Sequence, residues 1–141
     1  MTTIQRAAKV LIRRRSDGRY LVLTCSLWPD NPRRSQQPDL PGGNIEPHEH
    51  IEEGLLREVY EETGLTLAAH SLRLGYCFTR FARTISTNFL LYVGEIDDDD
   101  IILSWEHESY RWLSADDLKA MSIRDPYKEM FRYLASIELL V

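Results

Sequence analysis

The strongest constraint on the fold of this chain is the segment between Glu46 and Leu65. It reads EPHEHIEEGLLREVYEETGL, and its apolar residues recur at the three- and four-residue spacing of a helix that is buried along one side. Gly64 follows the periodic residues and predicts the end of the helix, because glycine adopts the left-handed conformation of a helix cap without strain. The segment therefore predicts a long helix packed on a core.

Three glutamates crowd the last turns of this helix, namely Glu58, Glu61 and Glu62. Like charges three or four residues apart repel by about 0.2–0.5 kcal/mol per pair, and Arg57 is the only lysine or arginine nearby. At about 100° per residue, the three acids fall on the margin of the apolar face. A solvated charged face is one interpretation; the other is a site for Mg²⁺ or Mn²⁺, which prefer oxygen ligands.

Glycines lie within and before the helix. Gly54, inside it, costs about 1 kcal/mol relative to alanine, and we expect it to leave open space beside the glutamates. Gly42 and Gly43 precede the helix, where a backbone without side chains can approach a ligand closely. These glycines favour the metal site over the solvated face.

Strand patterns lie on both sides of the helix, and two shorter helices are expected near the C-terminal end. Ser114 predicts a helix cap with Asp117, and Asp125 followed by Pro126 predicts the start of a last helix. The pattern indicates an α/β fold with a mixed sheet, in a single domain over 1–141. The expected strands cover 7–14, 19–26, 72–81, 86–96 and 109–113, with a loop over 27–38. The expected core of the last helix is Tyr127, Met130, Phe131 and Leu134.

The charge distribution is uneven. The net charge is −5, but seven acids lie between positions 46 and 62 and four at 97–100, so the remainder is mildly basic. That balance suits an anionic ligand bound through bridging cations, and it argues against a stable nucleic-acid partner. We read 97–100 as a solvated turn.

The sequence also predicts a cytoplasmic protein without a membrane partner. No apolar run approaches the roughly 18 residues of a membrane span, and the first residues lack a signal peptide's apolar core. Cys25 and Cys77 form no metal-ligand pattern and are expected to be reduced, partly buried thiols. The chain is expected to be a monomer or a homodimer.

The acidic helix and the glycines before it share one spacing pattern. Gly43, five residues, Glu49, seven residues and then REVYEETGL resemble the Nudix box, G-x5-E-x7-R-E-U-x-E-E-x-G-U, where U is aliphatic, at every defined position. One departure precedes it: the position before LPGG is often aromatic in that family and is Asp39 here.

The resemblance implies the Nudix fold, an α/β/α sandwich around a mixed sheet. It also implies Mg²⁺- or Mn²⁺-dependent hydrolysis of a nucleoside diphosphate linked to another group. Arg57 would orient a glutamate through a salt bridge. The implied metal ligands are Glu58, Glu61 and Glu62, assisted by Glu49 and the Gly43 carbonyl.

A general base must take a proton from the attacking water. In the family this base is either a glutamate of the box or an acid on a later loop. SWEHESYRWL is similar to that later segment, which makes Glu106 and Glu108 candidates, with solvated loop acids as the alternative. His107 is expected to be exposed on the loop, or else to contact a phosphate.

Substrate choice lies outside the box. The candidate substrate-binding residues are four arginines and two aromatic residues, with plain surface positions as the alternative: Arg6, Arg33, Arg34, Arg80, Trp28 and Phe81. The expected reaction releases pyrophosphate from a nucleoside triphosphate, as in the removal of modified nucleotides. The alternatives are hydrolysis of ADP-ribose or another nucleotide sugar, hydrolysis of RNA 5′ ends, and a Nudix sensor that binds nucleotide without cleaving it.

Overall fold

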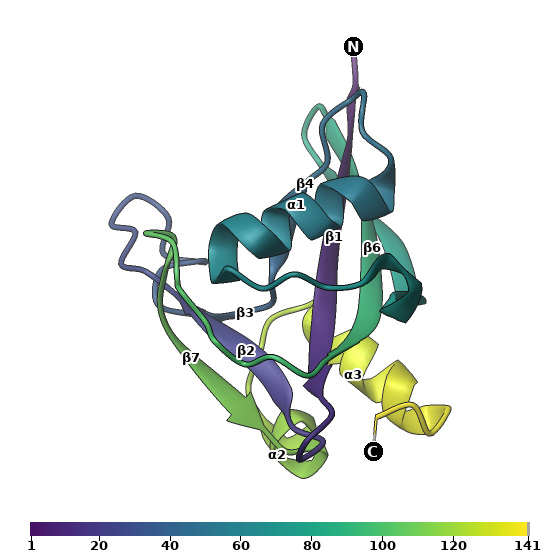
Figure 1. Ribbon diagram of the computed structural model, residues 1–141. Coiled ribbons are helices and arrows are strands. Elements are labelled where there is room, and N and C mark those ends of the chain that lie inside the picture. The colour runs from purple at the N-terminus through teal and green to yellow at the C-terminus, as the bar shows by residue number, and fades with distance from the viewer. Residues whose placement is uncertain (141) are drawn as a thin grey trace.

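A seven-stranded mixed β-sheet forms the centre of the molecule, and the computed structural model describes residues 1–140 (Figure 1). The strands are β1 (Thr3–Arg14), β2 (Tyr20–Cys25), β3 (Pro38–Asp39), β4 (Gly42–Asn44), β5 (Arg73–Ala82), β6 (Ile85–Ile96) and β7 (His107–Leu113). The helices are α1 (Ile51–Thr63), α2 (Ala115–Ala120) and α3 (Tyr127–Ser136), with a 3-10 turn at Ala69–Ser71. The sequence predicted every helix and five strands; it missed β3 and β4, which are too short to show a period.

Strand β1 is the centre of the sheet. It runs parallel to β6 along its whole length, whereas its other edge is shared by β2 and β4, both antiparallel to it. The main path is β3-β2-β1-β6-β5, with β4 on β1 and β7 on β2. The expected mixed sheet is therefore confirmed, and the shared edge brings the segment 42–44 against the middle of β1.

Alternate residues of β1 pack on opposite faces, as the period of two in a strand requires. Val10 packs with Leu55 and Val59 on the α1 side, whereas Leu11 packs with Phe131 on the α3 side. Figure 1 shows α1 crossing one face of the sheet, with α3 against the opposite face. Burying each such side chain contributes about 1.5–3 kcal/mol, and together they form the expected α/β/α sandwich.

The helix ends follow the sequence signals. Gly64 caps α1 with φ 74°, and its N–H donates to the Tyr60 carbonyl. The Ser114 hydroxyl accepts a hydrogen bond from the Asp117 N–H at 3.1 Å, capping α2. The four expected core residues of α3 are all buried.

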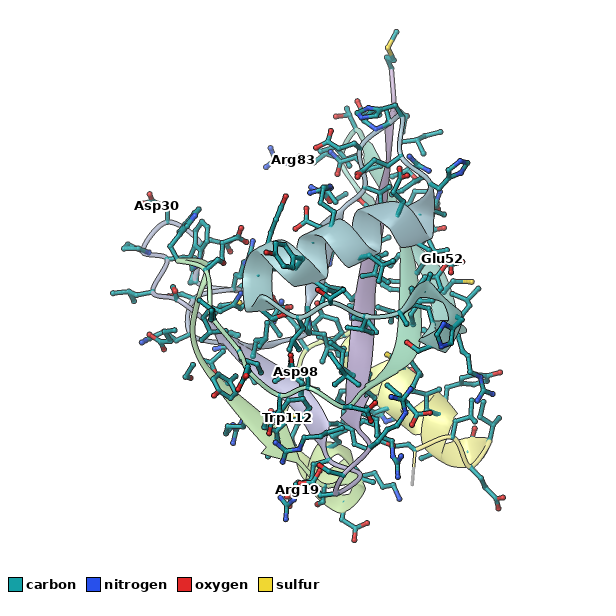
Figure 2. All side chains as sticks on the ribbon, viewed as in Figure 1. Arg19, Asp30, Glu52, Arg83, Asp98 and Trp112 are labelled. Atoms are coloured by element: carbon teal, nitrogen blue, oxygen red, sulfur yellow. The ribbon has the colours of Figure 1, made fainter. Side chains whose placement is uncertain are left out.

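The acidic run 97–100 lies on the surface. Figure 2 shows Asp98 in the segment that follows β6 and crosses in front of β1 and β2. Asp97 pairs with Arg15 at 3.0 Å and Asp99 with Arg14 at 3.0 Å, so the run is paired as well as solvated.

No helix within residues 1–140 is long and apolar enough to cross a lipid bilayer. Both thiols are free, as expected, but Cys25 is fully buried and Cys77 is exposed, so neither is partly buried.

Candidate active site

The glycine turn, residues 41–43, leads into and begins β4, and it lies directly against β1 and α1. A Cβ on Gly42 would meet the Ala8 backbone, and its φ of 131° also favours glycine. A Cβ on Gly43 would lie 3.0 Å from the Glu58 carboxyl carbon. The two glycines therefore let the backbone pack closely on β1 and on the Glu58 carboxylate.

Glu62 points into the protein beneath this turn. Its side chain is 2% exposed, and its Oε1 accepts the Gly42 N–H at 2.7 Å. Its Oε2 lies 3.6 Å from His107 Nδ1. Burial raises the pKa of Glu62 to about 7, because a charged carboxylate is poorly solvated there.

Arg57 holds the other acids of the Nudix-like pattern. Its guanidinium binds Glu49 through two hydrogen bonds of 2.8 Å, and its Nη1 lies 3.2 Å from both Glu58 and Glu61. The hydrogen bonds from Arg57 lower the pKa of Glu49 to about 2. One cation therefore relieves most of the repulsion among these glutamates.

Gly54 does not leave open space beside the glutamates, so that expectation is wrong. A Cβ there would lie 2.8 Å from Ile45 Cδ1 and 2.9 Å from Glu49 Oε1. The glycine instead allows the segment before α1 to pack tightly on the helix, which brings Glu49 within reach of Arg57.

A cavity of about 360 Å³ opens beside the glycine turn. Glu58, Gly43 and Asn44 line one part of it, and basic side chains line much of the rest. The remaining part of the lining is mainly Ala7, Phe89, Asp125 and Tyr127. Its basic residues are Lys9, Arg34, Arg80 and Arg124. The cavity therefore has the mixed charge that a polyphosphate carrying divalent cations requires.

Three of the predicted residues outside the Nudix-like pattern line this cavity: Arg34, Arg80 and Glu106. Arg34 Nη2 lies 3.2 Å from Glu106 Oε2, so the loop after β2 is tied to the segment before β7. Arg80 stacks over the Phe89 ring at 4.8 Å.

The other predicted residues lie outside the cavity lining. Arg6 donates to the Glu46 and Glu49 carbonyls at 2.7 and 3.1 Å and so fixes the approach to α1. Glu108 is exposed and accepts from Gln36 at 3.2 Å.

The remaining three positions are two exposed side chains and one that packs in the loop after β2. Arg33 is exposed, and Phe81 is 80% exposed at the end of β5. Trp28 packs on Trp105 with ring centroids 5.3 Å apart and supports Arg34, whose guanidinium lies 4.9 Å from the Trp28 ring.

Sequence reasoning missed Lys9 and Arg124 and misplaced His107. His107 is not exposed on the loop as expected; it is the buried first residue of β7 and lies 2.9 Å from Asp39. Burial opposes its charged form, but the hydrogen bonds to Asp39 and Cys25 and the charges of Asp39 and Glu62 together outweigh burial and raise the pKa of His107 to about 9. Asp39 was visible in the sequence as the departure from the family pattern, but no local signal linked it to the other three residues.

The donor atoms around the glycine turn fit a hard divalent cation, because they are carboxylate and carbonyl oxygens. Two groups of three potential ligands converge within 4.8 Å in the described part of the chain, and neither contains a glutamate of α1. In this arrangement Glu49, Glu58 and Glu61 are instead held by Arg57.

Comparison with known proteins agrees with this geometry. The NUDIX domain family model matches residues 3–134. A nucleoside triphosphatase, NudI, from Klebsiella pneumoniae is 32% identical over 113 residues, covering 74% of this chain and 79% of that protein. An asymmetrical bis(5′-nucleosyl)-tetraphosphatase from Rattus norvegicus is 34% identical over 85 residues, or 55% of each chain.

Solved structures share the fold. A MutT protein from Methanosarcina mazei superposes with a TM-score of 0.82 at 25% identity, covering 97% of this chain and 96% of that one. A Caenorhabditis elegans Ap4A hydrolase superposes with a TM-score of 0.68 at 22% identity, covering 95% and 97%. The family match over nearly the whole chain, together with the acidic helix against the glycine turn, establishes that this chain belongs to the Nudix hydrolase family.

Proposed function

We propose that this Nudix hydrolase cleaves a nucleoside triphosphate to a nucleoside monophosphate and pyrophosphate, with Mg²⁺ or Mn²⁺ as cofactor. The observation that carries the proposal is the cavity, in which Glu58 and Glu106 share the lining with four basic side chains. A triphosphate needs cations along its whole length, and arginine and lysine supply those that the metal ion does not. The similarity to a nucleoside triphosphatase over 79% of that protein supports the same substrate class.

We assign the metal ion to the end of α1 and the glycine turn. Arg57 would orient Glu49 and Glu58, which it contacts at 2.8 and 3.2 Å. When bound, the divalent ion neutralises phosphate charge and lowers the pKa of water. The proposed ligands are Glu58, Glu61 and Glu62, with Glu49 and the Gly43 carbonyl in support.

We assign the general base to Glu106 in preference to Glu108. Glu106 lines the cavity beside Glu58, whereas Glu108 binds Gln36 on the surface. In the reaction, the water oxygen would bond to the α-phosphorus and Glu106 would take the proton from water. The bond between the α-phosphorus and the bridging oxygen would break, and that oxygen would leave as part of pyrophosphate. Arg34, 3.2 Å from Glu106, would hold this carboxylate in the cavity.

A nucleotide panel with Mg²⁺ or Mn²⁺ tests the reaction, with products identified by chromatography. Monophosphate plus pyrophosphate is the expected outcome. Hydrolysis confined to a dinucleoside tetraphosphate, as the Rattus norvegicus relative's name describes, or confined to ADP-ribose, would replace the proposed substrate. Tight nucleotide binding with no turnover of any substrate would favour a sensor.

Glu62→Gln tests the assignment of the acidic helix. The expected result is a loss of kcat of about 10²-fold or more, because the site would lose a charged oxygen ligand. Glu53→Gln is the matched control, since Glu53 is an exposed acid on the same helix. Full turnover by Glu62→Gln on the best substrate would show that the assignment is wrong.

A further inference from the structure

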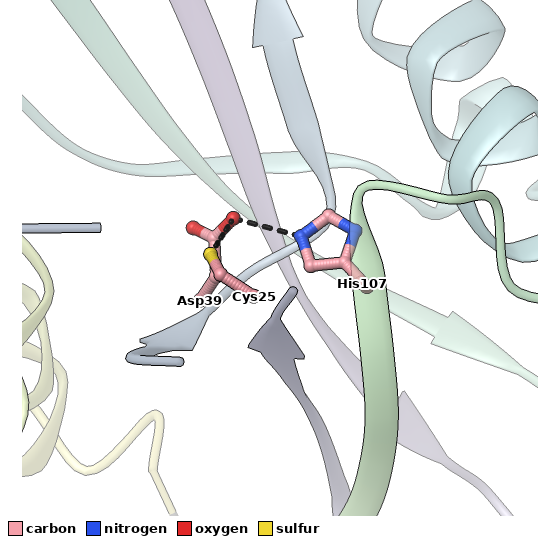
Figure 3. Close-up of side chains that lie close together, drawn as sticks. All are labelled: Cys25, Asp39 and His107. Carbon is pink, nitrogen blue, oxygen red and sulfur yellow. Dashed lines mark hydrogen bonds and ion pairs between the residues drawn. The ribbon is translucent and has the colours of Figure 1, made fainter. Parts of the chain in front are cut away.

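Asp39 is a fully buried carboxylate at the bottom of the cavity, surrounded by polar side chains from separate parts of the chain. Figure 3 shows two of these neighbours, Cys25 and His107, which reach it from β2 and β7. The others come from β1, from the segment before α3, and from α3 itself. The contacts are Lys9 Nζ at 3.3 Å, Tyr127 Oη at 2.7 Å, His107 Nε2 at 2.9 Å, Arg124 Nη2 at 3.3 Å and Cys25 Sγ at 3.6 Å.

This cluster is not a metal site, although Cys25, Asp39 and His107 bring three potential ligand atoms within 4.8 Å of one another. Both Asp39 oxygens already accept hydrogen bonds, and two of the donors, Lys9 and Arg124, are cations. A metal ion among them would be repelled by both positive charges. The role of Asp39 must therefore lie in the side chains that it binds.

Lys9 and Arg124 each connect Asp39 to the cavity. Both line it, with 11% and 33% of their side chains exposed. Lys9 Nζ also donates to the Leu40 and Gly42 carbonyls, at 3.1 and 3.0 Å. Arg124 also donates to the Pro38 carbonyl. The segment 38–42 thus binds both cationic side chains through its carbonyl groups and holds them in the wall of the cavity.

The charges of this cluster depend on one another. Burial disfavours the Lys9 ammonium, but Asp39, Tyr127 and Glu62 together outweigh burial and raise the pKa of Lys9, with Asp39 contributing most. Burial likewise disfavours the Asp39 carboxylate, but Lys9, His107 and Tyr127 outweigh it and hold the pKa of Asp39 well below its usual range. A buried ion that loses its partner is strongly destabilised, so without Asp39 the Lys9 ammonium would turn to solvent or lose its charge.

We propose that Asp39 is a positioning residue for substrate binding, holding Lys9 and Arg124 so that their charges face the phosphates of the bound polyphosphate. This rests on the proposed function in one respect, that a polyphosphate is the ligand. A residue that only compensated buried charge would affect stability and leave ligand affinity unchanged.

The test uses inorganic triphosphate as the probe, because its binding requires neither a nucleobase nor turnover. Affinity is measured by titration calorimetry in EDTA. Asp39→Asn keeps an acceptor for His107 but removes the charge, and it should weaken triphosphate binding about tenfold. Cys25→Ala is the matched control: Cys25 touches Asp39 but does not line the cavity, so affinity should be unchanged even if the melting temperature falls.

A double-mutant cycle shows whether Asp39 acts through Arg124. Arg124→Gln alone should weaken triphosphate binding. Asp39→Asn should then cause a smaller further loss of affinity in the Arg124→Gln variant than it causes in the wild-type protein. With nucleotide as substrate, Asp39→Asn should raise KM more than it lowers kcat.

Arg124→Lys covers the case in which Asp39→Asn fails to fold. This variant keeps the positive charge, but a single ammonium group replaces the guanidinium, whose two nitrogens bind Asp39 and the Pro38 carbonyl. Weakened binding supports the proposal, and wild-type affinity in this variant or in Asp39→Asn overturns it, as does an absence of triphosphate binding by the wild type. Failure of the proposed function would appear differently, as triphosphate binding without turnover of any nucleotide.

Discussion

Arg57 binds three carboxylates with one guanidinium, and its geometry explains how α1 accommodates its acids. Two parallel hydrogen bonds of 2.8 Å fix Glu49, and the remaining nitrogen reaches Glu58 and Glu61. Such a fork matches carboxylates in a way that an ammonium cannot. We therefore propose that Arg57 is a positioning residue whose planar shape matters as well as its charge.

Arg57→Lys keeps the charge and removes the fork. We expect kcat to fall about 10–100-fold, because misdirected supporting groups commonly cost that much at metal sites. Steady-state assays over a range of Mn²⁺ concentrations measure it, and the metal concentration for half-activity should rise in parallel. Arg6→Lys, which changes an arginine that binds backbone carbonyls beside α1, is the comparison; equal losses in both variants would contradict a role specific to Arg57.

His107 links the buried carboxylates of Asp39 and Glu62. Its pKa is about 9 in the folded protein against 6.5 when unfolded. The folded state therefore holds this proton more tightly, and the resulting stability is complete below pH 6.5 and is lost as the pH rises through 9. Glu62, with a pKa of about 7, loses its proton before most of this change occurs.

The free energy of unfolding should fall by on the order of 1–2 kcal/mol between pH 7.5 and 9 because of His107. Urea unfolding in EDTA at several pH values measures the slope. His107→Gln should flatten it, whereas His48→Gln, at an exposed histidine, should leave it intact. A wild-type slope retained in His107→Gln would assign the titration to another group.

At the scale of elements, α1 and the segment before it are fitted to each other through Gly54. A glycine inside the helix costs about 1 kcal/mol relative to alanine, but its lack of a side chain lets Ile45 and Glu49 pack directly on the helix backbone. This contact sets how Glu49 meets Arg57 and so connects a packing choice to the site.

Gly54→Ala should destabilise the protein by about 1–2 kcal/mol, even though alanine is the better helix former. The new Cβ would lie under 3.0 Å from atoms of Ile45 and Glu49, and overpacking costs more than the gain in propensity. Thermal unfolding measures it. Glu53→Ala, at an exposed position of the same helix, isolates the effect of helix propensity and should be neutral or stabilising. If Gly54→Ala stabilised the protein, Ile45 and Glu49 would have to move aside at little energetic cost.

At the scale of the whole molecule, the cavity forms where several layers meet. Glu58 comes from α1, Lys9 from the centre of the sheet, and Arg124 from the segment before α3. Metal binding at the α1 end should therefore stabilise the whole fold, because ligands that bind only the native state shift unfolding by mass action.

Mg²⁺ or Mn²⁺ at a hundredfold excess over its Kd should add about 2.7 kcal/mol to the free energy of unfolding. Denaturant titrations with and without the metal measure it. The double variant Glu58→Gln/Glu62→Gln should lose this increment. Equal stabilisation of the double variant would place the ion elsewhere, for instance at the exposed acids 98–100.

Much of the fold could be predicted from the sequence, because α1, α3 and the long strands bury residues at regular spacing. The sequence also singled out several residues that line the cavity, namely Glu58, Arg34, Arg80 and Glu106. The sequence showed Gly54 as an unusual residue inside a helix, but the expectation of open space beside it was wrong. A helical period does not show which residues pack against each position.

By itself, the sequence determined that α1 carries a cluster of acids at the margin of its buried face and that two glycines precede it. These are local facts, fixed by spacing along one helix and one turn. Only the tertiary structure decided that Lys9, Asp39, His107 and Arg124 meet, because these residues lie up to 115 positions apart in sequence and no local signal links them. Their meeting depends on how β1 shares its edge between β2 and β4, and on the stability that a buried carboxylate gains from surrounding cations.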